Sequence, residues 1–182
     1  MRMEVHVHGI VEMRSGATLA EIEAALRPWL NYVDVESLAE AKSVHMDEPG
    51  IAYDNQKHVL EVCWTGDVGK NFQKSIEEAF QLLGPYTSEA AEFELSFYHD
   101  DGEDEFTLLF VGPSAEAVFE AQRRRMTEDV ASLLARQFTD AEVRQVVGLV
   151  NQLFDQRSPA DGTPRAEGSS TMAVPPGRKH LH

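Results

Sequence analysis

Hydrophobic and polar residues alternate in several short segments of this sequence, and a period of two is typical of half-buried β-strands. The clearest case is residues 3–13, where Val5 and Val7 share one face while His6 and His8 share the other. Four further strands are expected, near 41–46 and at 58–64, 92–99 and 106–111. In the last of these we expect Phe106, Leu108 and Phe110 to face the core.

Other segments place their apolar residues three and four positions apart, which predicts amphipathic helices at 18–30, 67–83, 114–136 and 139–156. Capping boxes mark two starts, one at Thr18 with Glu21 and one at Thr139 with Glu142. Pro28 should bend or shorten the first helix. The last helix has a wide apolar stripe, which needs a partner surface, and its members are Val143, Val146, Val147, Val150, Leu153 and Phe154.

The predicted order is strand, helix, two strands, helix, two strands and a helical pair. Its first six elements, over about residues 3–99, follow the order of the split β-α-β plait and therefore resemble the ferredoxin-like fold. This resemblance implies an α+β protein with an antiparallel sheet of about five strands and two crossover helices on one face. We expect the other face to contact solvent, the C-terminal helical pair or a second copy. Ferredoxin-like folds carry many unrelated functions, so the resemblance transfers none.

Composition divides the chain near residue 157. We expect one α+β domain over 1–157, made of a ferredoxin-like core at 1–112 and a helical pair at 113–157. Residues 158–182 hold four of the eight prolines and no aromatic residue, which predicts a disordered tail.

The net charge of -15 argues against binding to nucleic acid or to an anionic membrane, because both attract clustered positive charge. The open face also lacks the aromatic residues of an RNA-recognition sheet, since Tyr98 is its one aromatic side chain. No apolar run approaches the roughly 18 residues of a membrane-spanning helix. With a single cysteine and no signal-peptide pattern, the sequence favours a cytoplasmic protein.

The polar face of the first strand is the main candidate for chemistry. In the expected sheet, His6 and His8 would lie beside Glu61 and Glu94 of neighbouring strands, and imidazole with carboxylate suits a divalent metal. A solvent-exposed sheet surface has the same pattern, so both interpretations stay open. Cys63 is interpreted as a small packed residue rather than as a nucleophile.

Two charged clusters are interpreted as surface features. The acidic run at 99–105 departs from the spacing of a calcium-binding loop, which favours a charged hairpin tip. Arg123, Arg124 and Arg125 are consecutive on a helix and point about 100° apart, so they favour ion pairs with nearby acids over one anion clamp.

No phosphate loop, nucleophile elbow or Cys-x-x-Cys pair is present, so no motif indicates an enzymatic activity, which favours a non-catalytic role and leaves catalysis open. The first hypothesis is a non-catalytic interaction or assembly module, with a homo-oligomer or protein partner on the C-terminal helices or the open sheet face. The alternative is a protein that binds a small molecule or a divalent metal through His6, His8, Glu61 and Glu94, with catalysis as an open extension.

Overall fold

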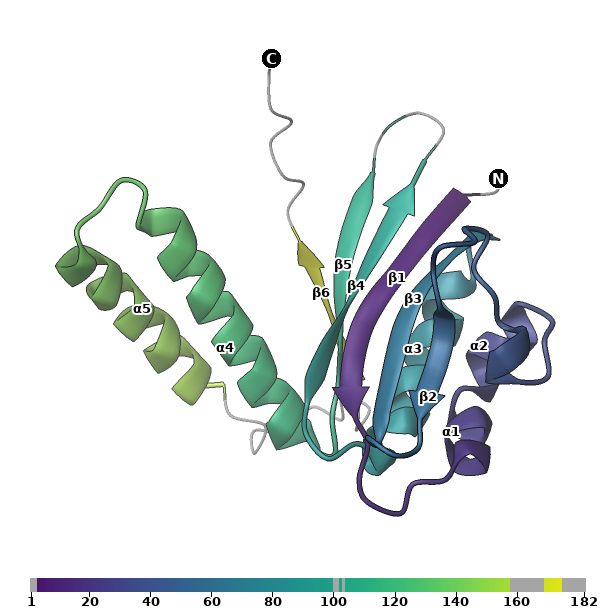
Figure 1. Cartoon of the computed structure of the whole chain (residues 1–182). Helices are drawn as coiled ribbons and strands as arrows, with labels where there is room; N and C mark the ends of the chain where they lie inside the picture. Colours follow the sequence, from purple (N-terminus) through teal and green to yellow (C-terminus); the bar gives the residue numbers. More distant parts are fainter. Residues whose placement is uncertain (1–2, 100–101, 103, 158–168, 175–182) are drawn as a thin grey trace.

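The computed structural model describes residues 3–99, 102, 104–157 and the backbone of 169–174. Its strands are β1 (Met3–Glu12), β2 (Gly50–Asp54), β3 (Val59–Val68), β4 (Ala91–Tyr98), β5 (Glu105–Val111) and β6 (Ser169–Val174). They form one sheet in the order β2-β3-β1-β4-β5-β6, and every neighbouring pair is antiparallel (Figure 1). The predicted α+β class with an antiparallel sheet is confirmed.

Three helices cover one face of this sheet (Figure 1). They are α1 (Leu19–Ala25), α2 (Arg27–Tyr32) and α3 (Phe72–Leu83), and two short 3-10 turns lie at Leu38–Glu40 and Gly84–Tyr86. Both hydrogen bonds of the capping box at Thr18 and Glu21 are present. The single helix predicted at 18–30 is divided at Leu26, because Pro28 enters the first turn of α2 instead of continuing α1.

Aromatic side chains fill the space between these helices and the sheet. The ring of Trp29 meets that of Trp64 edge to face, with 5.5 Å between centroids. The ring of Phe80 lies 4.6 Å from that of Phe93. Because Val5 and Val7 of β1 are fully buried beside them, the apolar face of the first strand is the centre of the core, as the alternation predicts.

The strand predicted near 41–46 is not present. Those residues form a loop, and the second strand is β2, which begins at Gly50, directly after Pro49. Pro49 and Gly50 have the composition of a turn, but Gly50 is already the first residue of the strand. The turn into β3 comes later, where the Asp54 carboxylate accepts hydrogen bonds from the backbone N–H groups of Gln56 and Lys57.

The facing of β5 also differs from the prediction. Leu109 and Val111 point into the main core, whereas Leu108 and Phe110 lie on the opposite face, in a second apolar cluster. Phe106 is partly exposed. Alternation could not decide the facing, because Leu108 to Val111 form an unbroken apolar run that is buried on both faces.

The second cluster lies under a helical hairpin made of α4 (Ala115–Leu134) and α5 (Asp140–Asp155). Val118 and Ala121 in the first half of α4 pack on β5. Further along, α4 diverges from the sheet, and α5 lies on the far side of α4 (Figure 1). The capping box of Thr139 with Glu142 is present at the start of α5.

The segment predicted as a disordered tail is described only in part. Within it, Ser169–Val174 pair with β5 as strand β6 at the edge of the sheet, which differs from the expectation for those six residues. The rest of 158–182 lies outside the described residues, as do Asp100, Asp101 and Glu103 of the predicted acidic hairpin tip.

Candidate metal site on the open face of the sheet

The polar side chains of β1 lie on the sheet face opposite α1, α2 and α3. Antiparallel pairing sets His8 directly between Cys63 of β3 and Glu94 of β4. Two residues before His8, and on the same face of β1, His6 lies between Thr65 of β3 and Ser96 of β4. The predicted face therefore exists, with its two imidazoles adjacent and nearly parallel, 6.2 Å apart between ring centroids.

The four predicted metal ligands are not gathered around one point. Glu61 lies opposite Ile10 of β1, further down the sheet than His8, and its side chain is exposed. His8 and Glu94 face each other across β1 and β4 but are also exposed. His6 is the one of the four that is partly buried, with 28% of its side chain accessible.

Glu48, which the sequence analysis did not identify, lies beside His6. It comes from the loop that precedes β2, and 16% of its side chain is accessible. One carboxylate oxygen lies 3.4 Å from Nδ1 of His6 and accepts a hydrogen bond of 3.0 Å from the hydroxyl of Thr65. The other oxygen accepts a hydrogen bond from the hydroxyl of Ser43.

The buried hydroxyl of Thr65 links His6 to Glu48. Its oxygen is 2.8 Å from Nδ1 of His6, and its single proton goes to Glu48. Thr65 therefore holds the imidazole of His6 and the carboxylate of Glu48 in defined positions relative to each other.

Backbone contacts hold the Glu48 loop against β3. The hydroxyl of Ser43 accepts from the backbone N–H of Thr65 at 3.0 Å, and the N–H of Val44 donates to the carbonyl of Thr65 at 2.9 Å. The indole N–H of Trp64 donates to the carbonyl of Lys42 at 3.1 Å. These bonds replace the strand pairing expected near 41–46 and give the loop a defined position over the site.

The pKa of Glu48 reflects two opposing effects. Partial burial raises the pKa of Glu48. The hydrogen bonds from Ser43 and Thr65 and the nearby imidazoles of His6 and His45 lower it, and together they outweigh the effect of burial. The net result is a pKa below the ordinary value for glutamate. Glu48 is thus an anion at neutral pH.

Cys63 completes a group of three chemically different ligands. One atom each from His6, Glu48 and Cys63 lie within 4.8 Å of one another. Burial raises the pKa of the Cys63 thiol, and the carboxylates of Glu48, Glu61 and Asp47 raise it further. Those carboxylates make the surroundings of the thiol negative, which favours a bound cation as well as the thiol proton.

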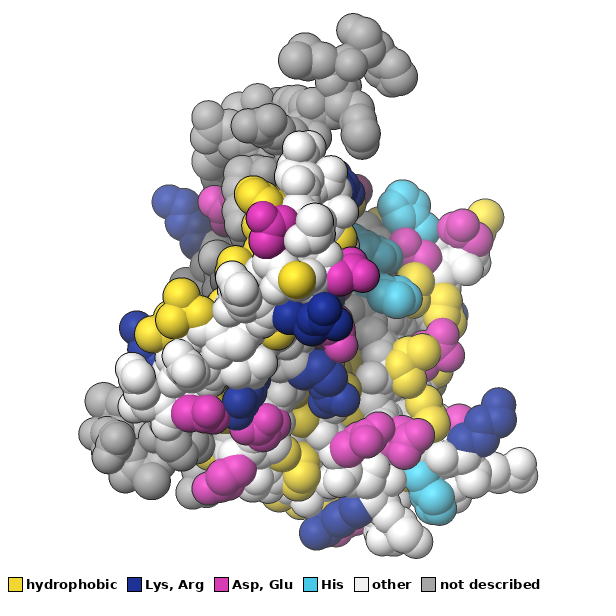
Figure 2. Space-filling model, turned by 90° about the vertical axis from the view of Figure 1, so that its left-hand side faces the viewer, with side chains coloured by type: hydrophobic (Ala, Val, Ile, Leu, Met, Phe, Trp, Pro, Cys, Tyr) yellow, Lys and Arg dark blue, Asp and Glu magenta, His cyan; other side chains and the backbone are white. Residues whose placement is uncertain are grey.

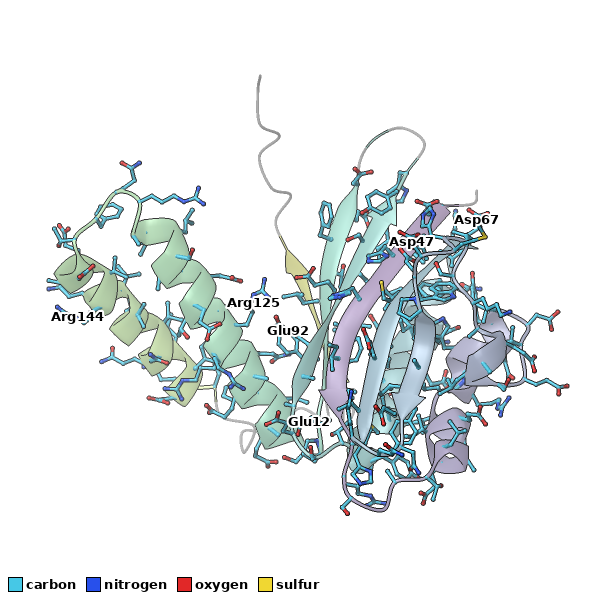
Figure 3. The ribbon with its side chains drawn as sticks, in the orientation of Figure 1. Glu12, Asp47, Asp67, Glu92, Arg125 and Arg144 are labelled. Atoms are coloured by element: carbon cyan, nitrogen blue, oxygen red, sulfur yellow. The ribbon has the colours of Figure 1, made fainter. Side chains whose placement is uncertain are left out.

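The arginine triplet behaves as its helical spacing predicts. Arg125 bridges α4 to the sheet through an ion pair with Glu92 at 2.5 Å, and it also contacts Asp129 (Figure 3). Arg123 turns to α5, where it binds Asp155 at 2.8 Å, while Arg124 is exposed. The three guanidinium groups therefore do not converge on one anion.

The geometry defines an α+β protein with a helix-covered sheet face, a polar face carrying a histidine, carboxylate and thiol cluster, and a projecting helical hairpin. None of the described helices combines the length and apolar character needed to cross a bilayer. The model of the family described as "Family of unknown function (DUF6806)" matches residues 3–155, so the chain belongs to that family. Neither the curated proteins nor the solved structures include a match to the chain.

Proposed function

We propose that the protein binds a divalent transition-metal ion through His6, Glu48 and Cys63. The observation that carries this proposal is the convergence of three different ligand atoms, from β1, β3 and the intervening loop, within 4.8 Å. Imidazole, carboxylate and thiolate together suit Zn²⁺ better than Mg²⁺ or Ca²⁺, which prefer oxygen ligands.

Metal binding would need only local movement at these three side chains. Bond lengths of about 2.0–2.3 Å in tetrahedral zinc sites leave ligand atoms about 3.5 Å apart. Cys63 would release its proton on binding, so binding should tighten as pH rises. His8, opposite Cys63 on β1, is the residue best placed to add a fourth ligand. Thr65, which contacts both His6 and Glu48, would orient them from outside the site.

Titration of the full chain with Zn²⁺, and with Co²⁺ as an optical reporter of thiolate ligation, tests this proposal. We expect one ion per chain, a thiolate-to-cobalt absorption band, and at least tenfold weaker binding in His6→Ala and Cys63→Ser. Glu61→Gln is the matched control, because Glu61 lies on the same strand as Cys63, is exposed, and belongs to the ligand set predicted from sequence.

Two results would overturn the site. One is the absence of stoichiometric Zn²⁺ or Co²⁺ binding by the folded, reduced protein. The other is a loss of affinity in Glu61→Gln that equals the loss in Cys63→Ser. Thermal unfolding of each variant without metal separates a lost ligand from a lost fold.

We also propose that the protein is an interaction or assembly module, which is a second and independent function. It is supported by α5, which contributes no buried residue although it carries a wide apolar stripe. The half-buried Val143, Val147, Val150 and Phe154 account for one side of that stripe. Val146, Leu149 and Leu153 are exposed and available to another protein.

For the fold itself, we propose a ferredoxin-like sheet enlarged by β5 and β6 at one edge. The order β2-β3-β1-β4 of the first four strands, with the crossover helices on one face, supports this assignment. We keep 1–157 as the proposed extent of the domain. The cytoplasmic location expected from the single cysteine would maintain Cys63 as the thiol that the metal site requires.

A further inference from the structure

The exposed side of α5 carries a narrow apolar stripe. Val146, Leu149 and Leu153 are 41%, 57% and 49% accessible, and their spacing of three and four residues puts them on one line along the helix. The stripe is separate from the α4 contact, which is made by residues such as Phe154, whose ring meets Phe119 at 5.3 Å between centroids. α5 therefore has apolar residues on two adjacent sides, and its own chain covers one of them.

Charge is distributed very unevenly between this hairpin and the rest of the chain. Residues 1–114 hold 22 acidic and 7 basic residues, a net charge of -15, whereas residues 115–157 hold 7 acidic and 6 basic residues, a net charge of -1. Figure 2, in which the hairpin side faces the viewer, shows acidic and basic side chains interspersed with hydrophobic ones. Two copies of the chain would repel each other most strongly if their sheet regions approached, and least if their hairpins approached.

The stripe is also complementary to itself. If two α5 helices lie antiparallel and cross beside Leu149, Val146 of each approaches Leu153 of the other. The Glu142 end of one helix then approaches the Arg157 end of the second. Acidic and basic ends thus meet on both sides of an apolar centre, which is the arrangement of a two-fold symmetric interface.

From these observations we infer that α5 is a homodimer interface, in which its exposed stripe packs antiparallel on the same stripe of a second copy. This inference rests on the proposed assembly function and names its partner. The open sheet face plays no part in the pairing, so the proposed metal site stays accessible in the dimer.

Light scattering coupled to size exclusion, over a wide range of concentrations of the full chain, measures the pairing. We expect a concentration-dependent dimer whose dissociation constant rises at least tenfold in Leu149→Asp. Gly148→Asp is the matched control, since it adds the same charge to an exposed position in the middle of α5 that points away from the stripe and has open space around it. It should leave the dimer unchanged. Circular dichroism at low concentration should show the same helix content for both variants.

Cross-linking locates the contact. In a Cys63→Ala background, Leu149→Cys should form a disulfide-linked dimer on mild oxidation, because Leu149 lies at the crossing point, whereas Ala141→Cys should form no intermolecular disulfide. A dimer that tolerates Leu149→Asp would overturn the α5 pairing and leave the assembly function intact. If the chain is monomeric at every concentration and a different protein binds the stripe, the α5 pairing is overturned and the assembly function again stays intact. A monomer that binds no protein would overturn both.

Discussion

The helices α3 and α5 have similar sequence patterns but very different surroundings. Each has an apolar stripe at helical spacing that predicts its existence. In α3 the stripe is completely enclosed, and its buried members are Phe72, Ile76, Ala79, Phe80 and Leu83. In α5 no residue is buried. A stripe therefore predicts that a helix forms and which side is apolar, but it does not show what covers that side.

Chain connections explain the difference. α3 joins β3 to β4, strands that lie on either side of β1, and the chain must cross the sheet between them. This crossover places α3 on the sheet face, where α2 packs beside it. α5 follows α4 through a short loop, and no described strand comes after it until β6. Among the described residues, α5 packs mainly on α4, through contacts such as Phe119 with Phe154 and Arg123 with Asp155.

The largest effect in this comparison is expected from α3. Phe80→Ala removes a fully buried ring that packs on Phe93, and it should lower the free energy of unfolding by about 3–5 kcal/mol. Urea unfolding followed by tryptophan fluorescence measures this change. A loss below about 1 kcal/mol would mean that α3 is not part of the cooperative core.

An intermediate effect is expected inside the hairpin. Phe154→Ala removes a half-buried ring from the α4 contact, and the lost apolar burial and edge-to-face contact predict a decrease of about 1–2 kcal/mol. Circular dichroism during urea unfolding, compared with fluorescence from Trp29 and Trp64, shows whether the hairpin unfolds with the core. If the two signals coincide and the loss matches that of Phe80→Ala, the contrast between the two helices is wrong.

The smallest effect is expected on the exposed stripe. Leu149→Ala should change the stability of the monomer by no more than about 0.5 kcal/mol, because the side chain is more than half accessible. The measurement belongs at low protein concentration, since a dimer adds a stabilisation that depends on concentration. A large loss for the monomer would show that Leu149 packs within its own chain, contrary to its exposure.

Much of the fold follows from local sequence patterns. The alternation in β1 identifies the buried valines, and both capping boxes are present where Thr18 and Thr139 predict them. β2 was missed because Gly50, after a proline, has the composition of a turn. The facing of β5 was missed because Leu108 to Val111 are uniformly apolar. In both cases long-range contacts decide what short patterns leave undetermined.

Only the part of the candidate site that lies on strands could be predicted from the sequence. His6 was identified because a period of two assigns it to the polar face of β1. The proximity of Cys63 follows from the pairing of β1 with β3. Glu48 could not be identified, because its position depends on a loop anchored to Thr65 by Ser43 and Val44, and no periodicity records such an anchor. The sequence therefore indicates the surface, but Cys63 was assigned to packing and Glu48, which closes the cluster, was missed.

The uneven distribution of charge gives the molecule a preferred direction of approach. Residues 1–114 carry a net charge of -15, whereas the hairpin at 115–157 carries -1. The electrostatic field around the molecule is therefore strongly asymmetric. Two copies that diffuse together are turned so that their hairpins lead, and mobile ions screen this orienting force beyond about 8 Å at physiological ionic strength. Added salt thus relaxes the orientation of an encounter, and it also lowers the repulsion that keeps the acidic bodies apart.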